Sequence, residues 1–255
     1  MIDCAYSVEG EGPALILVHG IGAARSTWRK AIPLLTQHFT VISYDLRGHG
    51  ESPLPQGRFS LDDLVDDLEQ VRRLAGIERV HIAGHSLGGM IGPAYAHRFP
   101  ERVISLGLLS TAAFRTQDDS AKVMGVVQSM RDKGIAQVLS TLSDRWFTDE
   151  FIDRSPEVVE ARLQQVTDMD AEVFLNVFDI YAETEMSPWL HGVVAPSLVL
   201  TGENDGGCNP RLNRQIHNAL ENSELVILPH YRHSLLLEAG DVVARHLVRF
   251  CSQYQ

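Results

Sequence analysis

The sequence is short of cysteine, of basic residues and of long apolar runs, and each shortage excludes a class of protein. Its three cysteines, Cys4, Cys208 and Cys251, are far apart and lack metal-like spacing, so neither a disulfide framework nor a zinc site is predicted. Lys and Arg number 22 against 33 Asp and Glu, and the net charge of −11 argues against a nucleic-acid or anionic-membrane partner. No apolar run approaches the length of a membrane span.

The N-terminal residues MIDCAYSVEGEG also lack the basic start and apolar stretch of a signal peptide. Together with the expectation of reduced thiols, this predicts a cytoplasmic protein. The 255 residues, 44% of them hydrophobic, suffice for one large α/β domain or for a core domain with an insertion. A homo-oligomeric assembly stays open.

Apolar runs typical of buried parallel strands alternate with helical segments through most of the chain. Strands are predicted at 14–19, 39–44, 80–83, 103–109, 197–201 and 225–228. Helices are predicted from about 26, at 60–75, after 86, at 211–220 and up to about 251. Between about 113 and 187 only helical periodicity is found, near 120–133, 135–142, 156–169 and 171–184. We therefore expect an α/β fold, a mostly parallel doubly wound sheet in residues 1–112 and 188–255, with an all-helical insertion at 113–187.

Residues 79–90, RVHIAGHSLGGM, carry a G-x-S-x-G pattern after a short apolar run. We interpret them as a buried strand, a sharp turn and the start of a helix. Such a junction holds the middle serine above the edge of the sheet, and the flanking glycines relieve crowding. Ser86 is therefore the candidate nucleophile. By itself the pattern is short enough to occur by chance in an ordinary glycine-rich turn.

A serine hydroxyl needs a base to accept its proton, usually a histidine held in one tautomer by a carboxylate. His233 lies in the loop PHYRHS after the last predicted strand, and Asp205 lies in GEND after the preceding strand. Loops after parallel strands open on one edge of the sheet, so Ser86, Asp205 and His233 are expected to converge as a catalytic triad. His230 and Glu203 are competing candidates that the spacing favours less.

The tetrahedral intermediate of acyl transfer also needs hydrogen-bond donors for its oxyanion. The amide of Leu87 follows the nucleophile at the helix start. The second donor is expected in the loop HGIG, at Ile21, with Gly22 as the alternative. The glycines of this loop are equally compatible with a simple turn at the end of a strand.

Five motifs together resemble the α/β-hydrolase superfamily, and within it bacterial enzymes similar to β-ketoadipate enol-lactone hydrolases and related esterases. They are HGIG at 19–22, DLRGHGES at 45–52, GHSLGG at 84–89, GEND at 202–205 and the histidine at 233. The resemblance covers about residues 5–112 and 190–252, and it implies that the helical insertion is a cap over the active site. The serine at 86 disfavours dehalogenase and epoxide hydrolase chemistry, whose relatives carry an aspartate there. The same triad also serves C–C bond hydrolases, perhydrolases and lyases.

The aromatic residues of the insertion supply candidates for a substrate pocket, and we favour Trp146 and Trp189 among them. Trp28 is expected to pack in the core. Several arginines, Arg115, Arg131 and Arg145, have the chemistry to hold a substrate carboxylate, but such residues usually lie on a solvated face and none is assigned. Cys208 is expected to be a small apolar residue in a tight loop, and a position facing the pocket is the alternative.

The sequence therefore predicts a serine hydrolase without metal or cofactor that cleaves a small carboxylic ester or lactone through an acyl-enzyme. One alternative is a C–C bond hydrolase that uses the same triad on a ring-cleavage product. An alternative of another class is a ligand receptor that keeps the fold with vestigial catalysis. The nature of the acyl group stays open, because fold does not determine substrate.

Overall fold

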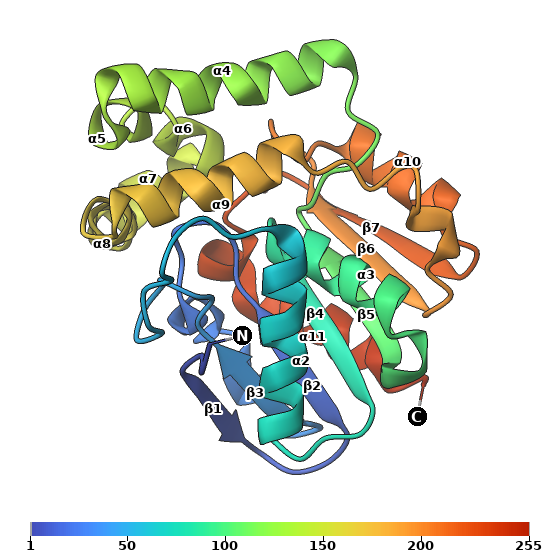
Figure 1. The fold of residues 1–255 in the computed structure, drawn as a ribbon. Coiled ribbons are helices and arrows are strands. Elements are labelled where there is room, and N and C mark those ends of the chain that lie inside the picture. Colours follow the sequence, from blue (N-terminus) through green and yellow to red (C-terminus); the bar gives the residue numbers. More distant parts are fainter. Residues whose placement is uncertain (1, 255) are drawn as a thin grey trace.

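The computed structural model describes residues 2–254, which form a seven-stranded sheet in the order β1-β3-β2-β4-β5-β6-β7 (Figure 1). The strands are β1 (Tyr6–Glu9), β2 (Ala14–Val18), β3 (Thr40–Tyr44), β4 (Val80–His85), β5 (Val103–Leu109), β6 (Ser197–Gly202) and β7 (Ser223–Leu228). Strand β1 pairs antiparallel with β3, and every other pairing in this sheet is parallel. The predicted α/β class and mostly parallel sheet are confirmed.

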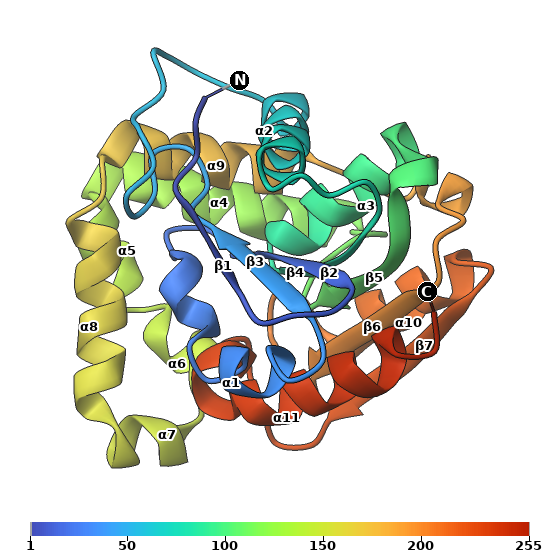
Figure 2. The same ribbon diagram turned by 90° about the horizontal axis from the view of Figure 1, so that it is seen from below.

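Helices cover both faces of the sheet (Figure 2). One face packs against α2 (Leu61–Leu74), α3 (Gly88–Arg98) and α10 (Pro210–Ala219), and the other against α1 (Ile32–Leu35) and α11 (Leu235–Cys251). Neighbouring residues of β2 alternate between these two cores, with Ile16 and Val18 in one and Leu15 and Leu17 in the other. Strand β2 is apolar without interruption because both of its faces are buried.

Helix α2 shows how a local signal sets an element boundary. Ser60 precedes the helix, its hydroxyl accepts a hydrogen bond from the amide of Asp63 at 3.3 Å, and the Asp63 carboxylate accepts one from the amide of Ser60 at 2.9 Å. This reciprocal capping box satisfies two donors at the helix start. Leu64, Leu68 and Val71 are fully buried, so the predicted helix and its apolar face are confirmed.

The helix expected from about residue 26 is shorter and more broken than predicted. The chain forms a 3₁₀ turn, η1 (Arg25–Trp28), followed by the single-turn helix α1. Pro33 lies in the first turn of α1, where a proline is tolerated, and it prevents an uninterrupted helix from Ser26. Trp28 is fully buried in the core beside α11, as expected.

Between β5 and β6 the described chain contains helices only. They are α4 (Gln117–Lys133), α5 (Ile135–Leu139), α6 (Ser143–Trp146), α7 (Asp149–Arg154), α8 (Pro156–Thr167), α9 (Ala171–Glu183) and η3 (Leu190–Gly192), whereas the short turn η2 (Pro100–Arg102) precedes β5. Helices α4 to α9, residues 117–183, lie together above one edge of the sheet, and we call them the cap (Figure 1). Helices α6 and α7 were not predicted, because segments of four and six residues are too short to show a helical period.

None of the helices in residues 2–254 combines the length and the apolar character that crossing a lipid bilayer requires.

Candidate active site

Ser86 occupies a tight turn between β4 and α3 with a left-handed backbone, φ 56°. A residue other than glycine rarely adopts this conformation, so the surrounding structure must hold it in place. The amide of Ser86 donates to the carbonyl of Leu109 at 2.9 Å, and the Thr111 hydroxyl donates to the carbonyl of Ser86 at 3.0 Å. The end of β5 thus fixes the turn that presents the serine.

The glycines of the pattern are explained by backbone packing. A Cβ on Gly84 would lie 2.0 Å from the carbonyl oxygen of Gly88, and a Cβ on Gly88 would lie 2.3 Å from that of Val18. Both separations are far below contact distance, so the turn closes on itself and onto β2 only with glycine at these positions.

Asp205 and His233 follow β6 and β7, and their side chains meet. Asp205 Oδ2 accepts a hydrogen bond from His233 Nδ1 at 2.8 Å. Asp205 Oδ1 accepts from the amides of Gly207 and Cys208 at 3.0 and 2.8 Å. Both carboxylate oxygens are therefore engaged, and Nε2 is the imidazole nitrogen left for other chemistry. Ser86, Asp205 and His233 line one cavity, so the structure brings the three predicted residues together.

Burial and charge act in opposite directions on this pair. Burial disfavours the imidazolium of His233, but the Asp205 carboxylate beside it outweighs that effect and raises the pKa of His233 well above its ordinary 6.5. Burial likewise disfavours the ionised form of Asp205, and the neighbouring imidazolium still lowers the pKa of that carboxyl below 3.8. The ionised Asp205 carboxylate therefore stabilises the imidazolium that forms when His233 accepts a proton.

The two competing candidates lie outside the cavity. Glu203 and His230 are exposed, and the Glu203 carboxylate accepts a hydrogen bond from the amide of His230 at 3.0 Å. This contact ties one loop to the other at the surface. Neither side chain is among the residues that line the cavity with Ser86.

The amides of Ile21 and Leu87 are available as donors. Within residues 2–254 neither amide donates a hydrogen bond, whereas the amide of Gly22 donates to His49 Nε2 at 3.2 Å. The engagement of Gly22 favours Ile21 over Gly22 as the second oxyanion donor. Leu87 directly precedes α3, where the positive end of the helix dipole adds to the effect of a free N–H group.

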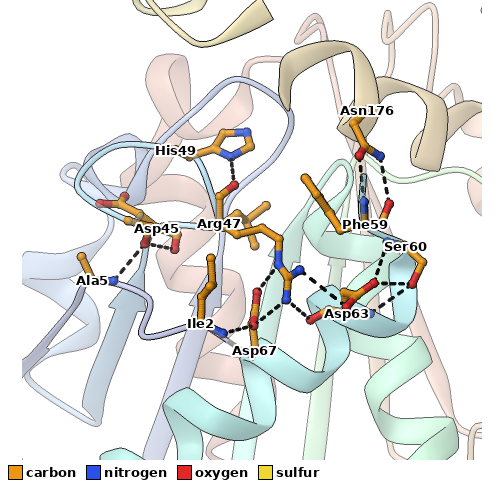
Figure 3. Close-up of polar contacts among 12 residues, drawn as sticks. Ile2, Ala5, Asp45, Arg47, His49, Phe59, Ser60, Asp63, Asp67 and Asn176 are labelled. Atoms are coloured by element: carbon orange, nitrogen blue, oxygen red, sulfur yellow. Dashed lines mark hydrogen bonds and ion pairs between the residues drawn. The ribbon is translucent and has the colours of Figure 1, made fainter. Parts of the chain in front are cut away.

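His49 links the loop at 19–22 to the loop at 45–52. Its Nδ1 donates to the carbonyl of Arg47 at 3.0 Å (Figure 3). This leaves Nε2 as the acceptor for the amide of Gly22. The Arg47 guanidinium in turn makes two hydrogen bonds to Asp67 of α2, at 2.6 and 2.8 Å. The DLRGHGES motif therefore acts as a buttress for the candidate oxyanion loop, a role that the sequence did not reveal.

Two buried histidines, His19 and His49, and the half-buried His85 stay neutral at neutral pH. Burial lowers the pKa of His19 to about 4 and the pKa values of His49 and His85 to about 3. His85 Nε2 donates to the carbonyl of His233 at 2.9 Å. Only His233 has a buried carboxylate as its partner, and this partner separates the candidate base from the structural histidines.

The cavity lies between the sheet edge and the cap and has a volume of about 170 Å³. Its cap wall is mainly apolar, formed by Val123, Val126, Leu142, Trp146, Phe178 and Tyr181. Two cap arginines, Arg145 and Arg162, also line it. Of the other arginines considered, Arg131 is paired with Asp179 at 2.6 Å and Arg115 lies against the Tyr181 ring.

The two predicted pocket tryptophans have different positions. Trp146 lines the cavity. Trp189 does not, and its assignment to the pocket is corrected: its ring contacts the ring of His97 with 5.4 Å between centroids and packs on the core beside α3. The segment between α9 and β6 leads Trp189 away from the site.

Arg162 lines the cavity but was not predicted to do so. Nothing in the helical sequence around it distinguishes it from a solvated arginine.

One group of side chains within residues 2–254 has the composition of a metal site, namely Asp205, Cys208 and His233, whose ligand atoms lie within 4.8 Å of one another. The Asp205–His233 hydrogen bond already engages two of the three. Cys208 is buried and its sulfur lies 3.3 Å from the Tyr181 hydroxyl. Cys208 thus lies at the cavity wall, next to Asp205 and His233, which agrees with the alternative of a pocket-facing position.

The cap contacts the loop that carries His233. The amide of Ser234 donates to the carbonyl of Trp146 at 2.8 Å, and the Arg232 guanidinium donates to the carbonyl of Phe147 at 2.6 Å. The Thr148 hydroxyl donates to Glu238 of α11 at 2.7 Å. The candidate base is therefore held from the cap side as well as from the sheet side.

Comparisons with known proteins identify the family and the fold. Residues 13–240 match the family described as the alpha/beta hydrolase fold. Over 197 residues the chain is 32% identical to 3-oxoadipate enol-lactonase 2 of Acinetobacter baylyi, covering 77% of this chain and 73% of that protein. The enol-lactonase structure from Burkholderia xenovorans LB400 has a TM-score of 0.90 and 25% identity, covering 98% and 97% of the two chains. A thermophilic esterase from Thermogutta terrifontis, malate bound, has a TM-score of 0.89 and 25% identity, covering 99% and 94%.

The packing of the turn predicts that Gly84→Ala lowers the free energy of unfolding by about 1–3 kcal/mol or more, because the new methyl group meets backbone that cannot move aside. Urea denaturation measures this change. Gly125→Ala is the matched control: its Cβ meets nothing within 4 Å in the middle of α4, and the substitution should stabilise the protein by roughly 0.5–1 kcal/mol. Equal effects of the two substitutions would contradict the packing argument.

The histidine environments predict distinct titrations in an NMR experiment on protein with ¹⁵N-labelled histidine. His233 should lose its proton at a pH above 6.5, and Asp205→Asn should lower that midpoint by removing the carboxylate. His19, His49 and His85 should remain neutral down to about pH 4, since burial disfavours their charged forms. A His233 midpoint that is unchanged in Asp205→Asn would show that the carboxylate does not control this imidazole.

Proposed function

The chain belongs to the alpha/beta hydrolase fold family, and on this premise we propose that it is a serine hydrolase that cleaves a small carboxylic ester or lactone through an acyl-enzyme. The observation that carries the proposal is the 2.8 Å hydrogen bond between His233 and the buried Asp205, on the wall of the cavity that Ser86 also lines. A nucleophile, a base and a group that orients the base are thus present at one place.

In the proposed acylation step, Ser86 Oγ attacks the substrate carbonyl carbon while His233 Nε2 accepts the serine proton. Asp205 holds the imidazole through Nδ1 and stabilises the imidazolium that forms. When the tetrahedral intermediate collapses, His233 returns the proton to the leaving alkoxide or enolate oxygen. In a lactone this step opens the ring, and the leaving oxygen stays connected to the acyl group through the remaining carbon chain.

In the proposed deacylation step, a water molecule replaces the serine hydroxyl as the nucleophile. His233 accepts a proton from the water, the hydroxyl adds to the acyl carbon, and collapse of the second tetrahedral intermediate releases the carboxylic acid. The proton then returns to Ser86 Oγ, so the enzyme is regenerated and the net reaction consumes one water molecule.

The oxyanion of both intermediates is proposed to accept hydrogen bonds from the amides of Ile21 and Leu87. Removing one such donor typically raises the barrier by roughly 3–4 kcal/mol. The hydrogen bond from the amide of Gly22 to His49 supports this assignment, because it fixes the peptide next to Ile21. Fixed dipoles are effective here because they need no reorganisation as charge develops.

The relatives support the class of reaction, since two of those reported above are enol-lactonases and one is an esterase. An ester or a lactone presents the same carbonyl to Ser86, so the triad does not discriminate between them. The cytoplasmic location expected from the sequence stays a prediction, as does the oligomeric state.

Replacement of Ser86 tests the mechanism. Ser86→Ala should lower kcat for a 4-nitrophenyl ester by roughly 10⁴- to 10⁶-fold, because the nucleophile is lost while the Cβ and the fold are kept. Labelling by a fluorophosphonate, detected by intact-protein mass spectrometry, should reach one adduct per chain in the unchanged protein and none in Ser86→Ala. Ser140→Ala, at an exposed position of the cap, is the control and should behave like the unchanged protein.

Two outcomes would favour the rival functions. Turnover of a ring-cleavage dienoate orders of magnitude faster than of any ester or lactone would indicate a C–C bond hydrolase. The absence of both a burst with an activated ester and a fluorophosphonate adduct would indicate a receptor with vestigial catalysis. Near-normal ester turnover by Ser86→Ala would overturn the serine mechanism itself.

A further inference from the structure

Cys208 is a buried thiol beside the candidate triad that the proposed mechanism does not use. It lies in the loop between β6 and α10 and lines the cavity with Ser86. Its amide donates to Asp205 Oδ1 at 2.8 Å, and its sulfur lies 3.3 Å from the Tyr181 hydroxyl. One ligand atom each of Asp205, Cys208 and His233 lies within 4.8 Å of the other two. A thiol, an imidazole and a carboxylate therefore meet at one place on the cavity wall.

The two other cysteines have different surroundings. Cys251 lies in α11, with the Ser105 hydroxyl 3.6 Å from its sulfur, and burial raises the pKa of its thiol to about 11. Burial raises the pKa of Cys4 to about 12. Neither residue lines the cavity, and among residues 2–254 neither belongs to a group of three metal-ligating side chains. They serve as internal controls for Cys208.

The three side chains have the composition and the spacing of a zinc site. Thiolate, imidazole and carboxylate all bind Zn²⁺, at about 2.0–2.3 Å, and two ligands of a tetrahedral ion are then roughly 3.3–3.6 Å apart. Asp205 Oδ2 and His233 Nδ1 are 2.8 Å apart, and the sulfur of Cys208 is within 4.8 Å of the ligand atoms of both. Shifts of about 1 Å in these side chains therefore suffice to surround the ion. A thiolate selects zinc over the hard cations calcium and magnesium.

Charge balance also favours a divalent cation at this place. The thiolate of Cys208 and the carboxylate of Asp205 together cancel the charge of Zn²⁺, so the complex adds no net charge to a buried site. For the same reason, the complex is not repelled by Arg145 and Arg162, which line the same cavity. The cavity has a volume of about 170 Å³, which leaves room for a water molecule as the fourth ligand.

We propose that Asp205, Cys208 and His233 form an inhibitory zinc site, in which a bound ion switches off the candidate triad. Zinc binds Nδ1 of the neutral His233 imidazole, whose proton moves to Nε2, and the thiol proton of Cys208 leaves to solvent. Nε2 then carries a proton and cannot accept one from Ser86. No oxidant or further reactant is needed, and removal of the metal by a chelator restores the base. The effect on turnover rests on the proposed function, whereas the metal site itself does not.

Cobalt(II) tests the metal site without any substrate. It binds the same kinds of ligand as zinc, and a cobalt–thiolate bond gives a charge-transfer absorption band in the near ultraviolet that zinc lacks. After dialysis against a chelator and its removal, the unchanged protein should develop this band up to one cobalt ion per chain, and zinc should abolish it. Cys208→Ser should not develop the band. Cys251→Ser, the matched control, should behave like the unchanged protein.

The effect on catalysis is measured with 4-nitrophenyl butyrate at a series of buffered free zinc concentrations. Zinc should inhibit the unchanged protein reversibly, with full recovery after addition of EDTA. Loss of one ligand should raise the inhibition constant by about 100-fold or more in Cys208→Ser, and Cys251→Ser should leave it unchanged. Each variant is compared with its own rate in the absence of zinc, so that a change in the basal rate does not enter the comparison.

The outcomes separate the zinc site from the proposed function. If the unchanged protein gives no cobalt–thiolate band, or if zinc inhibits Cys208→Ser and the unchanged protein equally, the zinc site is wrong even in an active hydrolase. A band that depends on Cys208, in a protein that turns over no ester, would sustain the metal site while the proposed function fails. Cys208→Ala is the second variant should Cys208→Ser fail to fold, as judged by far-ultraviolet circular dichroism.

Discussion

The close approach of backbone to backbone at Gly84 and Gly88 is the constraint on which the site depends. Because these two residues carry no side chain, β4 can turn directly into α3 while the turn rests against β2. The same geometry places Ser86 above the sheet edge and leaves the amide of Leu87 free at the helix start. The close packing at these two glycines therefore positions both a candidate nucleophile, Ser86, and a candidate oxyanion donor, the amide of Leu87.

A second layer of buried polar contacts keeps the neighbouring loops in place. Figure 3 shows the chain of contacts from Asp67 through Arg47 to His49. From His49 it continues to the amide of Gly22, next to Ile21. Buried polar groups stabilise a single arrangement only when each has a partner, and neutral histidines serve because they donate at one nitrogen and accept at the other. These contacts thus hold the loops at 19–22 and 45–52 in one arrangement.

Most of the fold and the three positions of the candidate triad could be predicted because each depends on local sequence. Ser86, Asp205 and His233 each follow a buried strand, and a parallel sheet brings such loops to one edge whatever the details of packing. The cap was predictable only as helices. Which of its side chains enter the cavity depends on how helices of weak periodicity cross the sheet edge, and for that reason Arg162 was missed and Trp189 was misplaced. The supporting role of His49 was hidden for the same reason, since it appears only when two loops meet.

The contacts between the cap and the His233 loop have a consequence for how the substrate specificity of this protein can change. Ser234 and Arg232 donate hydrogen bonds to the carbonyls of Trp146 and Phe147. The segment of the cap that shapes the cavity therefore also helps to hold His233, the candidate base, in position. The cap is then not an interchangeable module. Grafting the cap of a relative onto this core would alter the orientation of His233 together with the shape of the cavity. New specificity would therefore arise more readily by substituting single cavity-facing side chains than by exchanging the whole cap.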